Sequence, residues 1–148
     1  MGQVSSNKAV ESSLIGKAAP DIVLMKSDGS TSSVIGARQG GKAIIVFWAT
    51  WCPNCYEEMG TLYPNWKTIE QKGIKIILVD VGEGKDDVQK YFKQRQMNLI
   101  SFLDIDTSMQ GPYHLVGIPT LIFIDDKGIV RSVTHEFPED YTNYFGNQ

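Results

Sequence analysis

The chain of 148 residues has two cysteines, Cys52 and Cys55, and only Pro53 and Asn54 separate them. They follow an apolar run, Ala43 to Trp48, that has the composition of a buried strand. A strand that leads into Cys-x-x-Cys at the start of a helix holds two thiols where they can form a reversible disulfide. The first chemistry that the sequence predicts is therefore a two-electron thiol-disulfide couple.

The two thiols are expected to have different roles. Exchange requires one thiolate that attacks and a second thiol that resolves the mixed disulfide. Cys52 stands at the predicted helix N-terminus, where free N–H groups and the helix dipole lower a thiol pKa from ~8.5 to ~3.5–7.5. We therefore assign the attack to Cys52 and the resolving step to Cys55, which lies one helical turn later. Pro53 suits the first helical position, where its missing N–H costs little.

A metal site is the main alternative for a cysteine pair. Structural zinc requires four ligands at characteristic spacing. The chain has no second Cys-x-x-Cys, and its two histidines, His114 and His135, lie 21 positions apart. Covalent haem attachment needs a histidine directly after the second cysteine, and Tyr56 occupies that position. We predict no metal and no cofactor other than a redox-active Cys52–Cys55 disulfide.

The composition excludes several classes of protein. With 42% hydrophobic residues, the chain can bury one core but is too short for two independent ones. The net charge is -3, and lysines and arginines are scattered among acids, so no basic stripe is available for nucleic acid. No segment approaches the roughly 18 apolar residues that a membrane span needs. We expect a soluble monomer.

The N-terminal fifteen residues are polar and lack the apolar segment of a secretion signal. They predict a flexible leader over residues 1–15, followed by a single domain over residues 16–148. A polar leader is also what remains when a signal or an anchor has been removed, so that alternative stays open.

The apolar pattern predicts strands and helices in alternation. An N-terminal hairpin is expected, because residues 21–25 and 31–35 flank the turn Asp28-Gly29. Two strand-helix units then follow. Their segments are strand 42–48, helix 53–73 with a kink at Pro64, strand 74–81 and helix 86–96. The two strands should be parallel neighbours, with the first in the middle of the sheet.

The C-terminal third predicts a short strand over 101–104 and a short helix, with a weak pattern, over 107–115. Residues 120–124 and 128–133 pair as a hairpin around Asp125-Asp126-Lys127-Gly128. The tail, 138–148, can form a helix of at most two or three turns. This order predicts an α/β fold with a central mixed β-sheet flanked by helices and an N-terminal β-hairpin.

Several short motifs occur in an order that is typical of one family. They are Ala19-Pro20-Asp21, Phe47-Trp48-Ala49-Thr50-Trp51-Cys52-Pro53-Asn54-Cys55, Val81-Gly82-Glu83, Gly117-Ile118-Pro119-Thr120 and Ile124-Asp125-Asp126-Lys127-Gly128. The set covers about Gly16 to Val133. It resembles the thioredoxin fold and, more narrowly, the extracytoplasmic thiol-disulfide oxidoreductases of the TlpA/ResA type. The resemblance implies a thioredoxin-like domain.

The resemblance also adds residues to the predicted site. It implies a cis Ile118–Pro119 peptide that faces the disulfide, where the Ile118 backbone can bind an extended substrate. Pro119 belongs to the predicted substrate surface together with Trp51 and Pro53. The alternative for Pro119 is a trans proline that begins a strand.

A carboxylate is expected near Cys55. Cytoplasmic thioredoxins carry a buried aspartate six residues before the first cysteine, where this chain has Val46. The resemblance implies that Glu58 takes and returns the proton of Cys55, with a pKa raised by partial burial. The alternative is a first-turn acid that favours the helix dipole. Asp80, at the end of the second long strand, is the rival carboxylate, whereas Glu57 is expected to face water.

The resulting functional prediction is a protein-disulfide oxidoreductase that reduces extracytoplasmic protein disulfides, for example in cytochrome c maturation. Its expected partners are protein thiol or disulfide substrates and an upstream redox protein. A peroxiredoxin-type peroxidase is disfavoured, because Ile45 and Ala49 stand where that class has proline and threonine or serine. A Sco-like copper chaperone with His135 as a distal ligand is the other alternative, although that family separates its cysteines by three residues.

Overall fold

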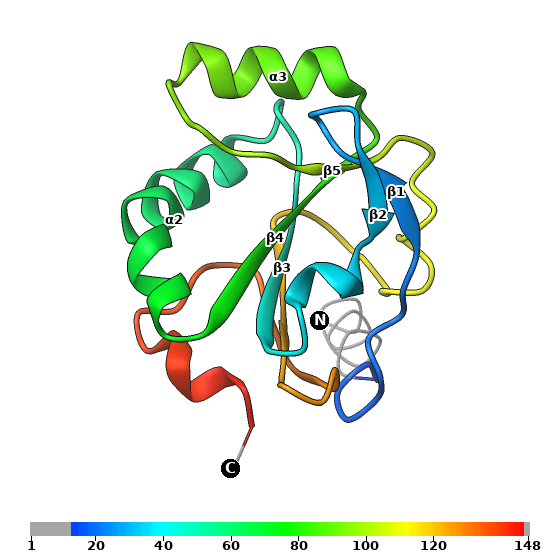
Figure 1. Ribbon diagram of the computed structural model, residues 1–148, viewed down its shortest axis with the longest axis vertical. Coiled ribbons are helices and arrows are strands. Elements are labelled where there is room, and N and C mark those ends of the chain that lie inside the picture. Colours follow the sequence, from blue (N-terminus) through cyan, green and yellow to red (C-terminus); the bar gives the residue numbers. More distant parts are fainter. Residues whose placement is uncertain (1–12, 147–148) are drawn as a thin grey trace, which may run out of the picture.

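Five strands form the central sheet of the computed structural model, which describes residues 13–146, in the order β5-β4-β3-β6-β7 (Figure 1). The strands are β3 (Lys42–Trp48), β4 (Ile74–Val81), β5 (Phe102–Asp104), β6 (Thr120–Ile124) and β7 (Val130–Thr134). Strand β3 is parallel to β4 and antiparallel to β6. The predicted mixed sheet, with its first long strand at the centre, is confirmed.

The central strand β3 is buried on both faces. Its alternating side chains divide between two apolar clusters: Ile44, Val46 and Trp48 lie in one, and Ala43, Ile45 and Phe47 lie in the other. A strand covered on both faces must be apolar throughout, which explains the uninterrupted run that marked it in the sequence. The end of this strand is consequently held rigidly where the cysteines begin.

Two helices, α2 (Pro53–Gln71) and α3 (Lys85–Gln94), pack on the face that carries Trp48. Helix α2 contributes Met59, Leu62 and Ile69 to this cluster. Pro64 lies inside α2, and Gly73 follows the helix with a φ of 81°, a left-handed conformation that favours glycine after a helix. In Figure 1, α2 lies to the left of the sheet and α3 above it.

The opposite face is covered by non-helical segments and by the predicted hairpin of β1 (Val23–Met25) and β2 (Thr31–Ser33). A short 3-10 helix, η1 (Ile35–Arg38), follows the hairpin. The helix predicted over 107–115 is wrong, because this segment forms successive turns. Its backbone is left-handed at Thr107 and His114, with φ of 58° and 51°, which a right-handed helix cannot accommodate.

Both ends of the described chain pack on this body. Residues 1–12 of the predicted leader lie outside the described residues, but Leu14 is buried in the second cluster, and the N–H of Gly16 donates to the Val130 carbonyl. In the tail, the residues up to 146 form one short 3-10 helix, η2 (Tyr141–Tyr144). Tyr141 and Phe145 bury their rings in the first cluster, so aromatic residues close the face that a longer helix could have covered.

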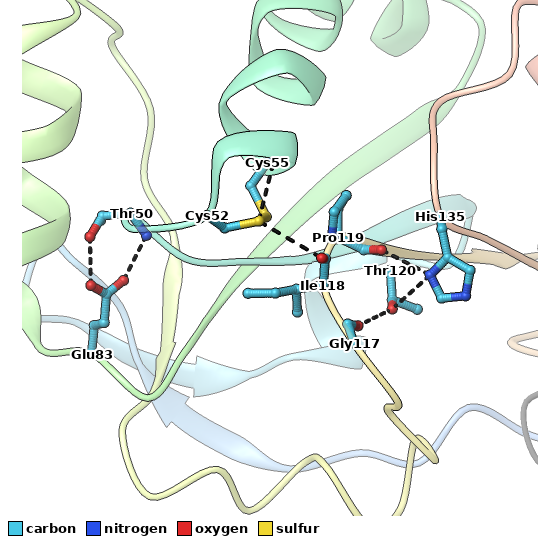
Figure 2. The surroundings of a disulfide bond; sticks show 9 residues. All are labelled: Thr50, Cys52, Cys55, Glu83, Gly117, Ile118, Pro119, Thr120 and His135. Atoms are coloured by element: carbon cyan, nitrogen blue, oxygen red, sulfur yellow. Dashed lines mark hydrogen bonds between the residues drawn. A yellow bond between two sulfur atoms is a disulfide. The ribbon is translucent and has the colours of Figure 1, made fainter. Parts of the chain in front are cut away.

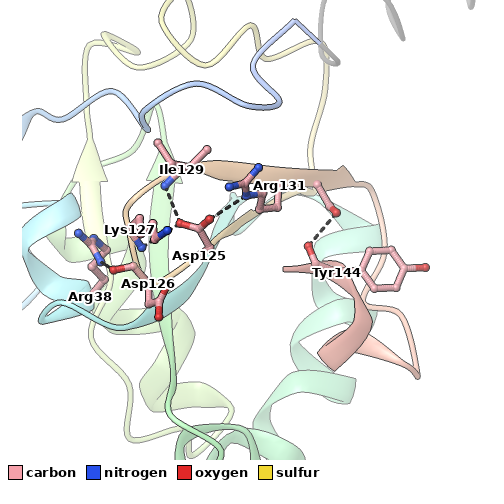
Figure 3. Close-up of polar contacts among 8 residues, drawn as sticks. Arg38, Asp125, Asp126, Lys127, Ile129, Arg131 and Tyr144 are labelled. Atoms are coloured by element: carbon pink, nitrogen blue, oxygen red, sulfur yellow. Dashed lines mark hydrogen bonds and ion pairs between the residues drawn. The ribbon is translucent and has the colours of Figure 1, made fainter. Parts of the chain in front are cut away.

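The β6–β7 hairpin turn is organised by one carboxylate (Figure 3). Asp125 accepts hydrogen bonds from the N–H groups of Lys127 at 2.9 Å and Ile129 at 3.0 Å, and from Arg131 Nε at 2.7 Å. These contacts replace strand pairing where the chain reverses and confirm the turn that the sequence predicted. No helix within residues 13–146 is long and apolar enough to cross a membrane.

Candidate active site

The cysteine pair lies where β3 leads into α2 (Figure 2). Cys52 and Cys55 form a disulfide, with their Cα atoms 5.2 Å apart. Cys52 caps the helix in an extended conformation, and its Sγ accepts the N–H of Cys55 at 3.2 Å. Pro53 is the first helical residue, as predicted. An N–H group at the beginning of a helix therefore points at the sulfur on which a thiolate would form.

The two sulfurs differ in their access to solvent. Cys52 is 5% exposed and Cys55 is 1% exposed. Beside them the Trp51 side chain is 68% exposed, which is unusual for a large apolar residue. Cys55, one helical turn further along the chain, is therefore the more buried of the two sulfurs.

The Ile118–Pro119 peptide is cis, as the resemblance implied. The carbonyl oxygen of Ile118 lies 3.8 Å from Cys52 Sγ. Ile118 also lines a cavity of about 270 Å³ together with Trp51, and the remaining lining residues are Val81, Gln110, Leu115, Val116 and Gly117. The fold thus brings Ile118 next to Trp51 and Cys52, although Ile118 lies 66 residues after Cys52 in the sequence.

His135 adds a polar contact to this loop that the sequence did not assign. Its Nδ1 lies 2.9 Å from the Pro119 carbonyl and 3.3 Å from Thr120 Oγ1, while that hydroxyl donates to the Gly117 carbonyl. A carbonyl can only accept, so Nδ1 carries the hydrogen. His135 is therefore adjacent to the proline loop. Within residues 13–146, no group of three or more His, Cys, Asp or Glu side chains is arranged to hold a metal.

Glu58 lies on α2, one turn after Cys55, and is partly buried. Its carboxylate accepts a hydrogen bond from the N–H of Phe137, which ties the helix to the C-terminal segment. Burial raises the pKa of Glu58, and the nearby charges of Glu136 and Glu57 act in the same direction. Partial burial and a raised pKa are the two properties that the resemblance implied for a proton carrier at this position. Glu57 is exposed, as expected.

The rival carboxylate, Asp80, belongs to a polar cluster behind the cysteine loop. It pairs with Trp48 across β4 and β3, and its side chain is fully buried. Its Oδ1 accepts the N–H of Glu83 at 3.1 Å. Glu83 in turn accepts the N–H of Thr50 at 2.8 Å and its hydroxyl at 2.5 Å. Asp80 is thus connected through Glu83 to Thr50, two positions before Cys52, and no signal in the sequence indicated this connection.

The pKa values of the two acids in this cluster are shifted in opposite directions. Burial, followed by the neighbouring Glu83 carboxylate, raises the pKa of Asp80 to about 9. Burial also opposes ionisation of Glu83, but its contacts with Asp80 and Thr50 outweigh that effect and lower the pKa of Glu83. At neutral pH the pair holds one proton, on Asp80, and Glu83 stays ionised to hold Thr50. Val46, at the position of the thioredoxin aspartate, is buried among apolar residues.

Comparison with known proteins agrees with this geometry. The model of the AhpC/TSA family matches residues 15–133. The chain is similar to the thiol-disulfide oxidoreductase ResA of Bacillus subtilis, with 31% identity over 134 residues that cover 86% of this chain and 74% of that protein. It is 33% identical to ResA of Bacillus cereus over 136 residues, which cover 86% and 76% of the two chains.

Solved structures show the same fold. The thioredoxin domain of a thiol-disulfide oxidoreductase from Bacteroides vulgatus superimposes with a TM-score of 0.75 at 23% identity. The superposition covers 87% of this chain and 93% of that domain.

Proposed function

Because the chain belongs to the AhpC/TSA family and is a thioredoxin-fold thiol-disulfide oxidoreductase, we propose that it reduces disulfides of extracytoplasmic proteins through Cys52 and Cys55. The observation that carries this proposal is the position of the disulfide. It lies at the N-terminus of α2, with the carbonyl of Ile118 at 3.8 Å from Cys52 Sγ. A substrate segment bound along that loop would have its own sulfur next to Cys52.

The reaction has two displacements. In the reduced protein the Cys52 thiolate attacks a substrate disulfide, forms a mixed disulfide and releases one substrate thiolate. The Cys55 thiolate then attacks the Cys52 sulfur, forms the disulfide present in the structure and releases the second substrate thiol. Two electrons pass from the cysteine pair to the substrate. An upstream reductant must return the pair to its thiol state, and the disulfide itself is the only redox group that this scheme requires.

Proton transfer accompanies the second displacement, because Cys55 must lose its proton before it attacks. We assign this proton to Glu58, which is one helical turn away and partly buried. A carboxylate with a raised pKa accepts a proton at a smaller free-energy cost than a fully exposed one, and can return it when the disulfide is reduced again.

The substrates are proposed to be proteins outside the cytoplasm, on the basis of the similarity to ResA. Apocytochromes c are one such class, and cytochrome c maturation is the process in which their disulfides would be reduced. The substrate surface is assigned to Trp51, Pro53, Ile118 and Pro119. Trp51 and Ile118 line the same cavity, which is the arrangement that supports this assignment.

The roles of the cysteines are tested by trapping. Reduced Cys55→Ser protein mixed with a peptide disulfide should accumulate a mixed disulfide on Cys52, detected as a mass increase of one peptide chain. The Cys52→Ser variant is the matched control and should trap none. Trapping by Cys52→Ser, with none by Cys55→Ser, would contradict the assignment.

The direction of electron flow is tested by the reduction potential, measured by equilibration with dithiothreitol or glutathione across pH. A reductant should have a potential at or below that of thioredoxin, ~-270 mV, whereas a value near ~-120 mV would mark a disulfide donor. Glu58→Gln should change the pH dependence of the Cys55 step, and the exposed Glu57→Gln is the control. Identical pH profiles for all three proteins would exclude Glu58 as the proton carrier.

A further inference from the structure

A second cavity lies between α3 and the loop that precedes Cys52. It has a volume of about 300 Å³ and is lined by Thr50, Asp87, Lys90, Tyr91, Gln94 and Arg95. Thr50 is two positions before Cys52. The other five lie on α3 or directly after it, at spacings of three or four residues that place them on one helix face. The cavity is polar, whereas the cavity at Ile118 is lined mainly by apolar residues.

Arg95 is the most constrained cation in this cavity. Its guanidinium lies 3.8 Å from the ring centre of Tyr91 and 4.8 Å from that of Tyr56. Tyr56 directly follows Cys55 in the chain. Contacts with two rings fix the plane of the guanidinium, so little rotamer entropy remains to be lost when Arg95 binds an acceptor. The same contacts link the cavity to the first turn of α2.

Two of the residues that line this cavity carry a buried polar atom without a hydrogen-bond partner. The Tyr91 hydroxyl and the Arg95 Nε are buried, and neither has a hydrogen-bond partner within the described part of the chain. The Tyr91 side chain as a whole is 4% exposed. Buried polar groups are nearly always paired, because an unpaired donor costs about 1–3 kcal/mol. The Arg95 Nε can only donate and the Tyr91 hydroxyl can donate or accept, so an acceptor is the kind of partner that would satisfy both groups.

Charge narrows the class of acceptor. Lys90 and Arg95 give the lining two positive charges and Asp87 gives one negative charge, so the lining itself has an excess of one positive charge; the Glu83 carboxylate, which binds Thr50, is not among the lining residues. A planar carboxylate matches the guanidinium fork and can accept two hydrogen bonds at once. A neutral acceptor would leave the excess charge unmatched.

We propose that this cavity binds an acidic side chain of the substrate protein, located within a few residues of the cysteine that Cys52 attacks. An extended chain spans ~3.3–3.6 Å per residue, so a neighbour of the substrate cysteine can reach past Thr50. This inference rests on the proposed function and adds a sequence preference to it. The cavity at Ile118 would contact the apolar part of the same segment.

The test uses capped peptides with one cysteine, joined through a disulfide to 2-nitro-5-thiobenzoate, whose release reports attack by reduced protein. Glutamate, glutamine or lysine is placed on either side of the cysteine, so the side chain is the only carboxylate. Wild-type protein should react roughly tenfold faster with the glutamate peptide than with the glutamine peptide at low salt. The lysine peptide should react most slowly.

Variants of the lining residues distinguish binding in this cavity from a general effect of the protein's charge on the reaction rate. Arg95→Gln and Lys90→Gln should each reduce the ratio of the rates with the glutamate and glutamine peptides several-fold. Asp87→Asn should increase the preference, because it removes the opposing charge. Lys93→Gln is the matched control, since Lys93 lies on the same helix but lines a different cavity. Circular dichroism confirms that each variant is folded.

The outcomes distinguish this inference from the proposed function. Equal rates with all peptides, unchanged in the variants, would show that the cavity does not select an acidic side chain and would overturn the inference while disulfide reduction stands. Inhibition by succinate at constant ionic strength, without a difference among peptides, would assign the cavity to a free carboxylate and also overturn it. If wild-type protein reduces none of the peptides although dithiothreitol does, the proposed function itself fails.

Discussion

Replacing Asp80 with asparagine should stabilise the folded protein at neutral pH, by an amount that grows as the pH rises. The side chain of Asp80 is fully buried. Its Oδ1 accepts the N–H of Glu83, but its Oδ2 has no hydrogen-bond partner within the described residues, so ionisation would leave a buried charge without compensation. Asparagine has nearly the same shape and carries no charge at any pH.

The size of the stabilisation by Asp80→Asn follows from the pKa of Asp80. Burial, followed by the Glu83 carboxylate, raises the pKa of Asp80 from 3.8 to about 9. Between these values the folded protein holds a proton that the unfolded chain has released. Stability therefore falls as the pH rises through this window, at ~1.4 kcal/mol per pH unit. From pH 5 to 8 this amounts to ~4 kcal/mol, and water that enters the loop on ionisation reduces the expected loss to ~2–4 kcal/mol.

The assay is urea denaturation of the oxidised protein at several pH values between 4 and 8.5. Wild type and Asp80→Asn should be about equally stable near pH 4, and the variant should be ~2–4 kcal/mol more stable at pH 8. The exposed Asp86→Asn makes the same change in charge on the surface and should show no such divergence. Parallel curves for wild type and Asp80→Asn would refute the reasoning, because they would mean that Asp80 is ionised in the fold.

Two further predictions concern the framework. Leu62→Ala removes a fully buried side chain of α2 and should lower the free energy of unfolding by ~2–5 kcal/mol; a loss below ~1 kcal/mol in urea would contradict the packing described here. Asp125→Asn should cost ~1–2 kcal/mol at pH 7. Burial opposes ionisation of Asp125, but bonds from Ile129 and Arg131 outweigh it and lower its pKa, so the stabilisation is lost as the pH falls below 3.8. The difference in the free energy of unfolding between wild type and Asp125→Asn should shrink at pH 2.5. A difference that stays constant with pH would mean that the shape of the side chain, and not its charge, causes the loss.

Much of the fold could be predicted because local patterns and burial agree. The run from Lys42 to Trp48 is apolar at nearly every position, and a strand of that kind is stable only in the middle of a covered sheet. The helix start at Cys52-Pro53 follows from cap preferences and from the fixed φ of proline. The segment 107–115 was predicted wrongly, because hydrogen bonds from Ser108 and Met109 to Asp104 hold turns that no helical period describes.

By itself, the amino-acid sequence determined the chemistry of the site, since two cysteines separated by two residues at a helix start can pair with each other without any distant contact. Tertiary structure decided everything that depends on separate segments meeting. It placed the Ile118 carbonyl at Cys52, and Asp80 behind Thr50 through Glu83. It also placed Arg95 against the ring of Tyr56. Except for the local bond between Asp80 and Glu83, these contacts join residues tens of positions apart, and the pKa shifts and unmet donors arise from burial, which only the packed chain creates.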